Sequence, residues 1–409
     1  MPGRSDVNDI GPRKLIVLLA AATALGPVAM QIYLPALPAV QSTFGTSLAL
    51  TQLTFSAFVF AIGPAQLLYG PLADRWGRRP VLIAGLALGF AGSMACYLAP
   101  DIHWLIGARM LQAVGGASGL VIARAILSDR YGTDEMAGRL ATLVMVMVIA
   151  PTLAPLVGGY VTDWFGWRSI FLLLSLLSLA VAAAVLRLLP ETLPAETREH
   201  RESLGRSIAG LLRKPLFHAY TVQAVLSVGM FYVFISTAPY LMESVMGRPA
   251  REYGLWFLLL AGGYTLGNLT STRQSRRFGI DRMILAGSVV ALAGTGTMAA
   301  LTSAGWWTPL ALFLPMAVVT YSSGLCAPNA QSGAVHQAPR RAGTASSLLG
   351  FMQQTIGAVL VQFVSVLDND SPVTLAVFLA VLACFAVLCA LAIRILGARA
   401  RSAATAAPD

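Results

Sequence analysis

Charged residues are scarce in this sequence. Of 409 side chains, 28 are basic and 18 are acidic, together 11% of the chain, whereas 56% are hydrophobic and the mean hydropathy is +0.71. A soluble globular protein carries about 25% charged residues, because its surface faces water. The composition therefore excludes a set of soluble domains and indicates a protein embedded in a membrane.

Cysteine and histidine are also scarce, with four of each. All four cysteines fall within apolar stretches, at Cys96, Cys326, Cys384 and Cys389. There they are typical of small packing residues rather than of a disulfide or metal framework. A GxGxxA string at 294–299 follows no strand and opens no helix, which argues against a dinucleotide site. We therefore expect no metal, no cofactor and no enzymatic activity.

Long apolar runs make up most of the chain. Twelve of them reach about 20 residues, the length that crosses a hydrocarbon core as an α-helix. They lie at 14–35, 50–72, 80–99, 103–128, 137–160, 167–189, 216–242, 251–272, 282–303, 306–328, 342–367 and 372–393. The predicted fold class is an all-α integral membrane protein with twelve transmembrane helices. We expect two six-helix halves, at 1–189 and 216–409, joined by a cytoplasmic linker at 190–215 with a short amphipathic helix near 204–212.

The basic residues are distributed unevenly over the loops. If the N-terminus is cytoplasmic, loops on that side hold 23 of the 28, and the opposite side holds only Arg168, Arg248 and Arg251. Cytoplasmic loops of membrane proteins carry such an excess, so both termini are predicted to be cytoplasmic. The net charge of +10 is then explained by topology, and nucleic-acid binding loses its support. Two arginines remain inside the fourth run, Arg109 and Arg124.

The two halves resemble each other in sequence. Arg-Trp-Gly at 75–77 follows the second run, and Arg-Phe-Gly at 277–279 follows the eighth, 202 residues later. A repeat of half the chain with an even number of spans predicts parallel repeats related by an axis along the membrane normal. Such repeats typically enclose a central substrate site with alternating access.

The loop between the second and third runs carries a family signature. Its sequence at 70–80, GPLADRWGRRP, resembles the cytoplasmic loop of the major facilitator superfamily. In this interpretation Gly70 permits close helix approach, Asp74 caps or pairs with arginines, and Arg78 and Arg79 reach carboxylates or helix C-termini. The plainer interpretation is a basic anchoring loop. The residues that match this gate motif are Gly70, Asp74, Arg75, Gly77, Arg78 and Arg79.

Two further segments resemble the drug:proton antiporter branch of that family. RMLQAVGG at 109–116 is similar to its fourth-helix motif, and APLVGG at 154–159 to its antiporter motif. YLPALP at 33–38 and GTASSL at 343–348 extend the resemblance to Bcr/CflA-type exporters over nearly the whole chain. In the antiporter motif, small residues and prolines indicate close helix packing. These residues are Pro151, Ala154, Pro155, Gly158 and Gly159.

One position departs from that pattern. Bcr/CflA-type exporters commonly carry an aspartate two residues before the first tyrosine, where this chain has Gln31, which cannot ionise. No other carboxylate falls in the middle of an apolar run, although ionisable groups inside spans are the usual proton carriers. If transport is coupled to protons, we expect Asp129 or Asp74 to carry them, with Glu243 a weaker candidate. Transport without proton coupling stays open as an alternative.

Polar residues inside the apolar runs are the candidates for substrate contact. Arg109 and Arg124 lie 15 positions apart, which places them on one helix face. In the plainer interpretation Arg109 bonds to backbone carbonyls near the first helix, and Arg124 reaches headgroups or pairs with Asp129. In the other, the loss of a carboxylate at Gln31 leaves a positive cavity that favours anionic, zwitterionic or neutral substrates. The predicted substrate-binding residues are Gln31, Tyr33, Arg109, Gln112, Arg124, Tyr232 and Gln353.

The family resemblance implies a multi-pass transporter of the bacterial inner membrane that exports drugs by alternating access. The expected partners are the lipid bilayer, a small-molecule substrate and, as coupling ions, protons; a monomer is expected. An exporter of an endogenous metabolite, such as a siderophore or an amino-acid derivative, is the alternative. A membrane receptor is disfavoured, because the gate motif is intact and no sizeable soluble domain is present.

Overall fold

The structure is a computed structural model of the full chain. The structure describes residues 10–131, 133–193, 210–212, 214–337, 342–367 and 371–405. Over these residues all regular secondary structure is helical, with twelve long helices, which confirms the predicted fold class. Most of the expected linker, including residues 204–209 of its amphipathic helix, lies outside the described residues.

The chain divides into two compact units. The first comprises 1–46 and 57–201, and the second comprises 47–56 and 202–409. The predicted boundary near the linker is close to this division, but the segment 47–56 at the start of the second long helix groups with the second unit. The order of the apolar runs could not assign residues 47–56 to the second unit, because membership of a unit depends on which helices a segment contacts.

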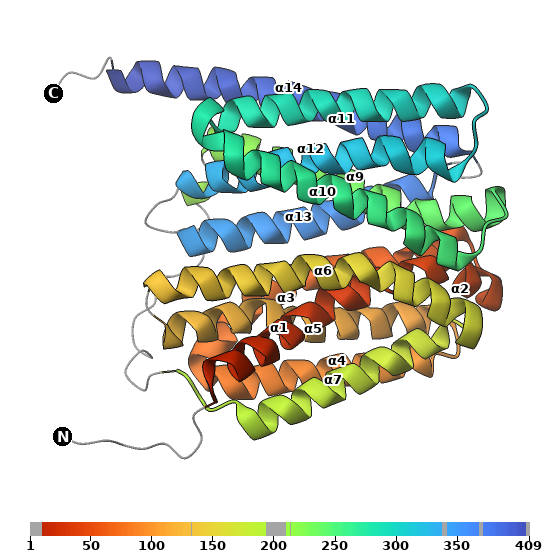
Figure 1. Ribbon diagram of the computed structural model, residues 1–409, viewed down its shortest axis with the longest axis vertical. Coiled ribbons are helices and arrows are strands. Elements are labelled where there is room, and N and C mark those ends of the chain that lie inside the picture. The colour runs from red at the N-terminus through yellow and green to blue at the C-terminus, as the bar shows by residue number, and fades with distance from the viewer. Residues whose placement is uncertain are drawn as a thin grey trace. The chain divides into compact units, whose positions relative to one another are not determined.

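The first unit is built from six long helices, with a short 3₁₀ turn and a short α-helix after the first of them (Figure 1). Their bounds are α1 (Pro12–Gln31), η1 (Leu34–Ala36), α2 (Leu37–Phe44), α3 (Leu48–Trp76), α4 (Arg78–Tyr97), α5 (Ile102–Arg130), α6 (Thr133–Phe165) and α7 (Arg168–Leu188). The α5 helix starts where the Asp101 carboxylate accepts the backbone N–H of Trp104 at 2.8 Å. This N-cap satisfies one of the amides that a helix start leaves without a partner.

The second unit repeats the arrangement of the first. Its helices are α9 (Pro215–Tyr240), the π-helical turn η3 (Leu241–Val245), α10 (Ala250–Phe278), α11 (Ile280–Ser303), α12 (Pro309–His336), α13 (Ala342–Ser365) and α14 (Pro372–Thr405). In the first unit α1 packs on α5, α6 and α7, and α4 packs on α5 and α7. In the second, α9 packs on α12, α13 and α14, and α11 packs on α12 and α14. These helix pairings correspond between the two units, as parallel repeats require.

The helices agree with the predicted spans, with one qualification. Among the described residues eleven helical segments are both long and apolar enough to cross a membrane. The exception, α10, has 29 residues but carries charged residues at both ends and several hydroxyl and amide groups in its middle. It packs against α12 of the second unit, and it is the eighth of the twelve predicted spans.

Small residues set the distance between helices in the first unit. A Cβ built on Gly26 in α1 would lie 2.7 Å from the backbone oxygen of Gly116 in α5. On the other side of α5, a Cβ on Gly115 would collide with the backbone of Gly89 in α4. Backbones this close leave no room for side chains, as is common where membrane helices pack. This packing places the polar side chains of α5 directly against α1 and α4.

Candidate functional site

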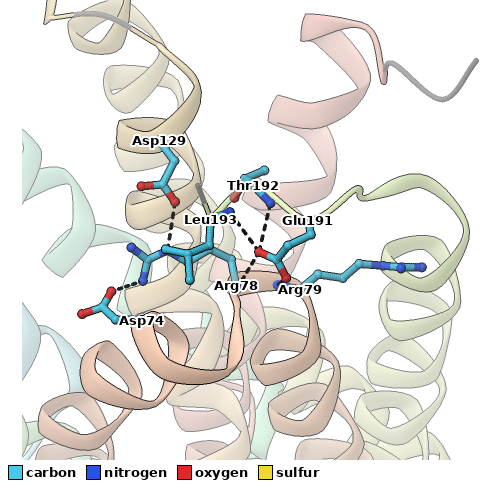
Figure 2. Close-up of polar contacts among 7 residues, drawn as sticks. All are labelled: Asp74, Arg78, Arg79, Asp129, Glu191, Thr192 and Leu193. Atoms are coloured by element: carbon cyan, nitrogen blue, oxygen red, sulfur yellow. Dashed lines mark hydrogen bonds and ion pairs between the residues drawn. The ribbon is translucent and has the colours of Figure 1, made fainter. Parts of the chain in front are cut away.

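A cluster of charged residues lies at the predicted cytoplasmic ends of α3, α4 and α5 (Figure 2). Arg78 is the first residue of α4, and its Nε donates to Oδ2 of Asp129, in the last turn of α5, at 2.9 Å. Its Nη1 donates to Oδ1 of Asp74, one turn earlier in the chain. The side chains of Arg78 and Asp129 are 10% and 15% exposed. One guanidinium thus holds the ends of three helices together.

A third carboxylate in this cluster comes from the segment that follows α7. The Glu191 side chain accepts the backbone N–H groups of Arg78 at 2.9 Å and Arg79 at 3.2 Å. It also accepts those of Thr192 at 2.9 Å and Leu193 at 3.0 Å (Figure 2). A carboxylate at a helix N-terminus satisfies free amides and interacts favourably with the helix dipole. Glu191 therefore caps α4 and ties the start of the linker to the gate motif.

Sequence reasoning placed Glu191 in the linker and gave it no function. Asp74 is the only acid within the 70–80 motif, but the folded cluster also contains Asp129 and Glu191. The available signal was the position of Glu191 directly after the sixth apolar run. An acid at that point lies at the same membrane edge as the gate motif.

The glycines of the gate motif have different roles from those expected. Within the described structure a Cβ built on Gly70 meets no atom within 4 Å, so the expected close helix approach there is not found. Gly77 is the restricted position, because its φ of 99° is strained for other residues and a Cβ would collide with the Glu191 carboxylate. Arg79 donates from Nη2 to the backbone oxygen of Leu186 at 2.7 Å, in the last turn of α7. Its expected reach to a helix C-terminus is confirmed, while Arg75 is exposed.

A second polar cluster surrounds Arg109, which is fully buried in α5. Its Nη1 donates to the backbone oxygen of Ala29 in α1 at 3.1 Å and to Oε1 of Gln112 at 2.5 Å. Gln112 in turn donates from Nε2 to Oγ of Ser93 in α4 at 2.8 Å. The bond to a carbonyl of the first helix is the one the plainer interpretation expected. This chain of contacts links α1, α5 and α4.

Aromatic rings enclose the Arg109 guanidinium. Its carbon lies 4.0 Å from the ring centre of Phe58, 4.6 Å from that of Tyr33 and 5.8 Å from that of Phe171. Cations are attracted to the faces of such rings, which offsets part of the cost of burial. No carboxylate among the described residues pairs with this arginine. The cluster therefore holds a positive charge that rings and amides stabilise.

Two donor atoms of Arg109, Nε and Nη2, have no hydrogen-bond partner in the described structure. Oε1 of Gln31, the last residue of α1, also has none, although Gln31 is only 5% exposed. Buried polar groups without partners are costly and are rare outside functional sites. The unused N–H groups of Arg109 can donate to an anion or to a polar uncharged group, and its positive charge repels another cation.

Access to this cluster is closed in the present conformation. Tyr33, Arg109 and Gln112 are all buried, and the cavity beside Gln112 and Ser93 measures only about 10 Å³. That volume is about the minimum for one water molecule. Substrate contact with these residues stays a prediction, and it requires the surrounding helices to separate.

Arg124 is not part of either cluster. It is exposed, and the expected pairing with Asp129 is wrong, because Asp129 pairs with Arg78. The reason is helical geometry: residues five positions apart on a helix are rotated by about 140° and do not share a face. Its predicted role in substrate binding stays a prediction without a contact in the described structure to support it.

The antiporter motif forms a packing face on α6. All five of its residues are buried, and a Cβ on Gly158 would collide with the backbone oxygen of Ile32, just after α1. Close packing of small residues was the expected physical role, and these contacts are consistent with it. The helix continues through both prolines, from Thr133 to Phe165.

The predicted residues of the second unit make hydrogen bonds between helices. Tyr232 on α9 donates to Oε1 of Gln354 on α13 at 2.8 Å. Gln353 donates from Nε2 to the backbone oxygen of Ala224 at 3.4 Å. Both residues are less than one tenth exposed. These contacts match the plainer interpretation of each, and their substrate contacts stay predictions.

Comparisons with known proteins agree with the fold and the motifs. The model of the Major Facilitator Superfamily matches residues 19–362. A bicyclomycin resistance protein homolog of Haemophilus influenzae is 26% identical over 87% of this chain and 90% of its own. Multidrug resistance protein D of Escherichia coli is 27% identical over 92% and 94%, and a chloramphenicol resistance protein of Pseudomonas aeruginosa is 30% identical over 85% and 83%.

Solved structures of similar fold are also transporters. The nucleoside transporter NupG superposes with a TM-score of 0.76 at 15% identity, covering 93% of this chain and 99% of its own. The xylose transporter XylE of E. coli gives 0.72 at 12% identity, covering 93% and 96%. At such low identity these structures establish the fold alone. The resemblance to Bcr/CflA-type exporters is confirmed by the sequence relatives.

Proposed function

This chain belongs to the Major Facilitator Superfamily, a multi-pass membrane family, and from that premise we propose that it exports small drug-like molecules by alternating access. The observation that carries the proposal is the similarity to bicyclomycin, chloramphenicol and multidrug resistance proteins over 85–92% of the chain. The protein acts in the bacterial inner membrane as a monomer, with both termini in the cytoplasm, and it is not an enzyme.

The charged cluster supports a gating role at the cytoplasmic side. Arg78 joins the ends of α3 and α5 to the start of α4, and Glu191 joins the linker to α4. These hydrogen bonds and ion pairs resist separation of the helix ends. The ends can separate only when the charged groups find other partners. Alternating access requires an element that has two stable arrangements. The cluster supplies the interactions of one of them.

The Arg109 cluster supports a preference for uncharged or anionic substrates. Arg109 is buried with two unused donor atoms, and the neighbouring end of α1 carries neutral Gln31 where related exporters commonly have an aspartate. A positive charge without a counter-charge raises the energy of any cation that approaches it. Once the helices separate, neutral, zwitterionic or anionic molecules gain hydrogen bonds there and lipophilic cations do not.

Proton coupling, if present, falls to the carboxylates of the cytoplasmic cluster. Asp129 is the better candidate, because it is mostly buried and ion-paired, whereas Asp74 is 41% exposed. Protonation of Asp129 would break its pairing with Arg78 and weaken the attachment of α5 to α4. Gating and proton binding would then use the same contact.

The test is transport by the purified protein in liposomes with an imposed pH gradient. We expect transport of chloramphenicol, which is uncharged, and at least tenfold slower transport of the ethidium cation, which corresponds to about 1.4 kcal/mol of discrimination. The Arg109→Met variant removes the buried charge and should therefore reduce the ratio of the chloramphenicol transport rate to the ethidium transport rate. If chloramphenicol transport is accompanied by proton flux, Asp129→Asn should abolish the flux.

Arg187→Ala is the matched control, because Arg187 is exposed near the end of α7 and belongs to neither cluster. It should transport as the unaltered protein does. Failure to transport any uncharged or anionic drug, with ethidium carried instead, would contradict the proposed substrate class. Absence of all transport by a correctly folded protein would contradict the proposed function.

A further inference from the structure

The two units share a glycine turn between consecutive helices. Gly77 lies between α3 and α4 with φ 99° and ψ 154°, and Gly279 lies between α10 and α11 with φ 80° and ψ 156°. In the first unit the α4 N-terminus that follows this turn holds the Glu191 carboxylate. The repeat therefore contains an anion position, which the chain itself fills in the first unit.

The corresponding position of the second unit has a different environment. The segment that supplies Glu191 leaves its helix at Leu188, whereas α14 continues as a helix to Thr405. Within the described residues no atom lies within 4 Å of a Cβ built on Gly279, although the same construction on Gly77 collides with Glu191. Beside Gly279 lies a groove of about 730 Å³ between residues 278–282 and residues 391–398 of α14.

The walls of this groove carry cationic groups. Arg282 from α11 and Arg394 from α14 both line it and are exposed, and neither has an ion pair or hydrogen bond with a described residue. Asp281 also lines the groove, and its Oδ1 accepts the Tyr220 hydroxyl at 2.6 Å. Two arginines and one acid leave a net positive charge of one, beside a helix N-terminus that adds partial positive charge.

The rest of the groove is apolar. Phe278, Leu391 and Ile395 line it and are 43%, 41% and 55% exposed. The guanidinium of Arg277 lies 5.3 Å from the ring centre of Phe278. By the distribution of basic residues, this end of α11 and α14 lies at the cytoplasmic surface of the membrane. A ligand that fits must present an anionic group at the surface and an apolar part along the helices.

We propose that this groove binds an anionic phospholipid of the cytoplasmic leaflet. The phosphodiester lies between Arg282 and Arg394, near the start of α11, where the equivalent place in the first unit holds the Glu191 carboxylate. The acyl chains lie along Leu391 and Ile395 on α14. Basic grooves between helices on the cytoplasmic side suit such headgroups. A free phosphate would use the arginines but leave the apolar walls uncovered, so the lipid is the better fit.

The test is native mass spectrometry of the full-length protein titrated with phosphatidylglycerol. Each cationic side chain near an anionic headgroup strengthens binding about fivefold. The double variant Arg282→Gln/Arg394→Gln should therefore bind phosphatidylglycerol about 25-fold more weakly. The control double variant Arg187→Gln/Arg273→Gln removes two exposed arginines outside the groove and should bind as the unaltered protein does.

Four results would overturn the proposal. They are an undiminished affinity in the groove variant, an equal loss in the control variant, equal binding of phosphatidylcholine with the same acyl chains, and displacement of the lipid by millimolar inorganic phosphate. The last result would assign the groove to a free anion. All four substituted arginines are exposed, so folding should be unaffected, and an unchanged thermal midpoint without lipid confirms it. Transport activity is not part of this readout, so the test is independent of the proposed function.

Discussion

At the scale of single residues, Gly77, Glu191 and Arg109 shape the first unit. Gly77 provides a backbone conformation that other residues rarely adopt, and the missing side chain leaves space for the Glu191 carboxylate. Arg109 places a positive charge inside the helix bundle without a carboxylate partner among the described residues. Each of these features depends on atoms that a substitution removes or displaces, so each can be tested by single variants.

Gly77→Ala should destabilise the protein more than Gly279→Ala. Both changes place a side chain at a positive φ, which costs about 1–3 kcal/mol. Only at Gly77 does the new Cβ also collide with the exposed Glu191 side chain, and loss of this cap of α4 adds about 0.5–2 kcal/mol. Unfolding in SDS, followed by circular dichroism, measures both. Equal destabilisation of the two variants would show that the Glu191 contact contributes nothing.

At the scale of helices, the two ion pairs of Arg78 contribute unequally to the attachment of α4 to its neighbours. The Asp129 side chain is 15% exposed and joins α5 to α4, whereas the Asp74 side chain is 41% exposed and joins α3 to α4 across a single turn. Water screens the more exposed pair, and exposed pairs contribute about 0–1 kcal/mol. A more buried charged hydrogen bond contributes about 1.5–3 kcal/mol. The α4–α5 attachment should therefore dominate.

Asp129→Asn should consequently lower the unfolding free energy more than Asp74→Asn does. Both substitutions preserve shape and remove one negative charge next to the same arginine, so each serves as the control for the other. A double-mutant cycle with Arg78→Ala isolates the coupling of each pair. A larger coupling for Asp74 than for Asp129 would refute the ranking by burial.

At the scale of the whole molecule, topology follows from the distribution of basic residues. With 23 of 28 in loops of one side and three on the other, reversal of the orientation would place most of them on the wrong face. Both termini are therefore predicted to lie in the cytoplasm. The helices of the structure are compatible with this assignment, because an even number of spans returns the chain to its starting side.

Reporter fusions test this topology directly. Green fluorescent protein fused after residue 409 should fluoresce, and alkaline phosphatase fused after residue 100, between α4 and α5, should be active. Phosphatase fused after residue 200 should be inactive, since the linker is expected in the cytoplasm. An active phosphatase at residue 200 together with an inactive one at residue 100 would reverse the assigned orientation.

Much of the protein is determined by the sequence alone. The apolar runs predict twelve membrane helices, the basic residues predict their orientation, and the 70–80 loop indicates the family. These features can be read because hydropathy and short motifs are local properties of the chain. The resemblance to Bcr/CflA-type exporters also predicts that Gln31 stands where those proteins commonly carry an aspartate.

Only the tertiary structure decided which charged groups meet. One interpretation of the sequence paired Asp129 with Arg124 on its own helix, but Asp129 pairs with Arg78, 51 residues away. Glu191 caps a helix that begins 113 residues earlier, which no local pattern indicates. Electrostatic partners depend on distances between helices and on side-chain direction around each helix axis. Both are set by packing of the whole unit, where glycines such as Gly26 and Gly116 bring α1 and α5 into contact.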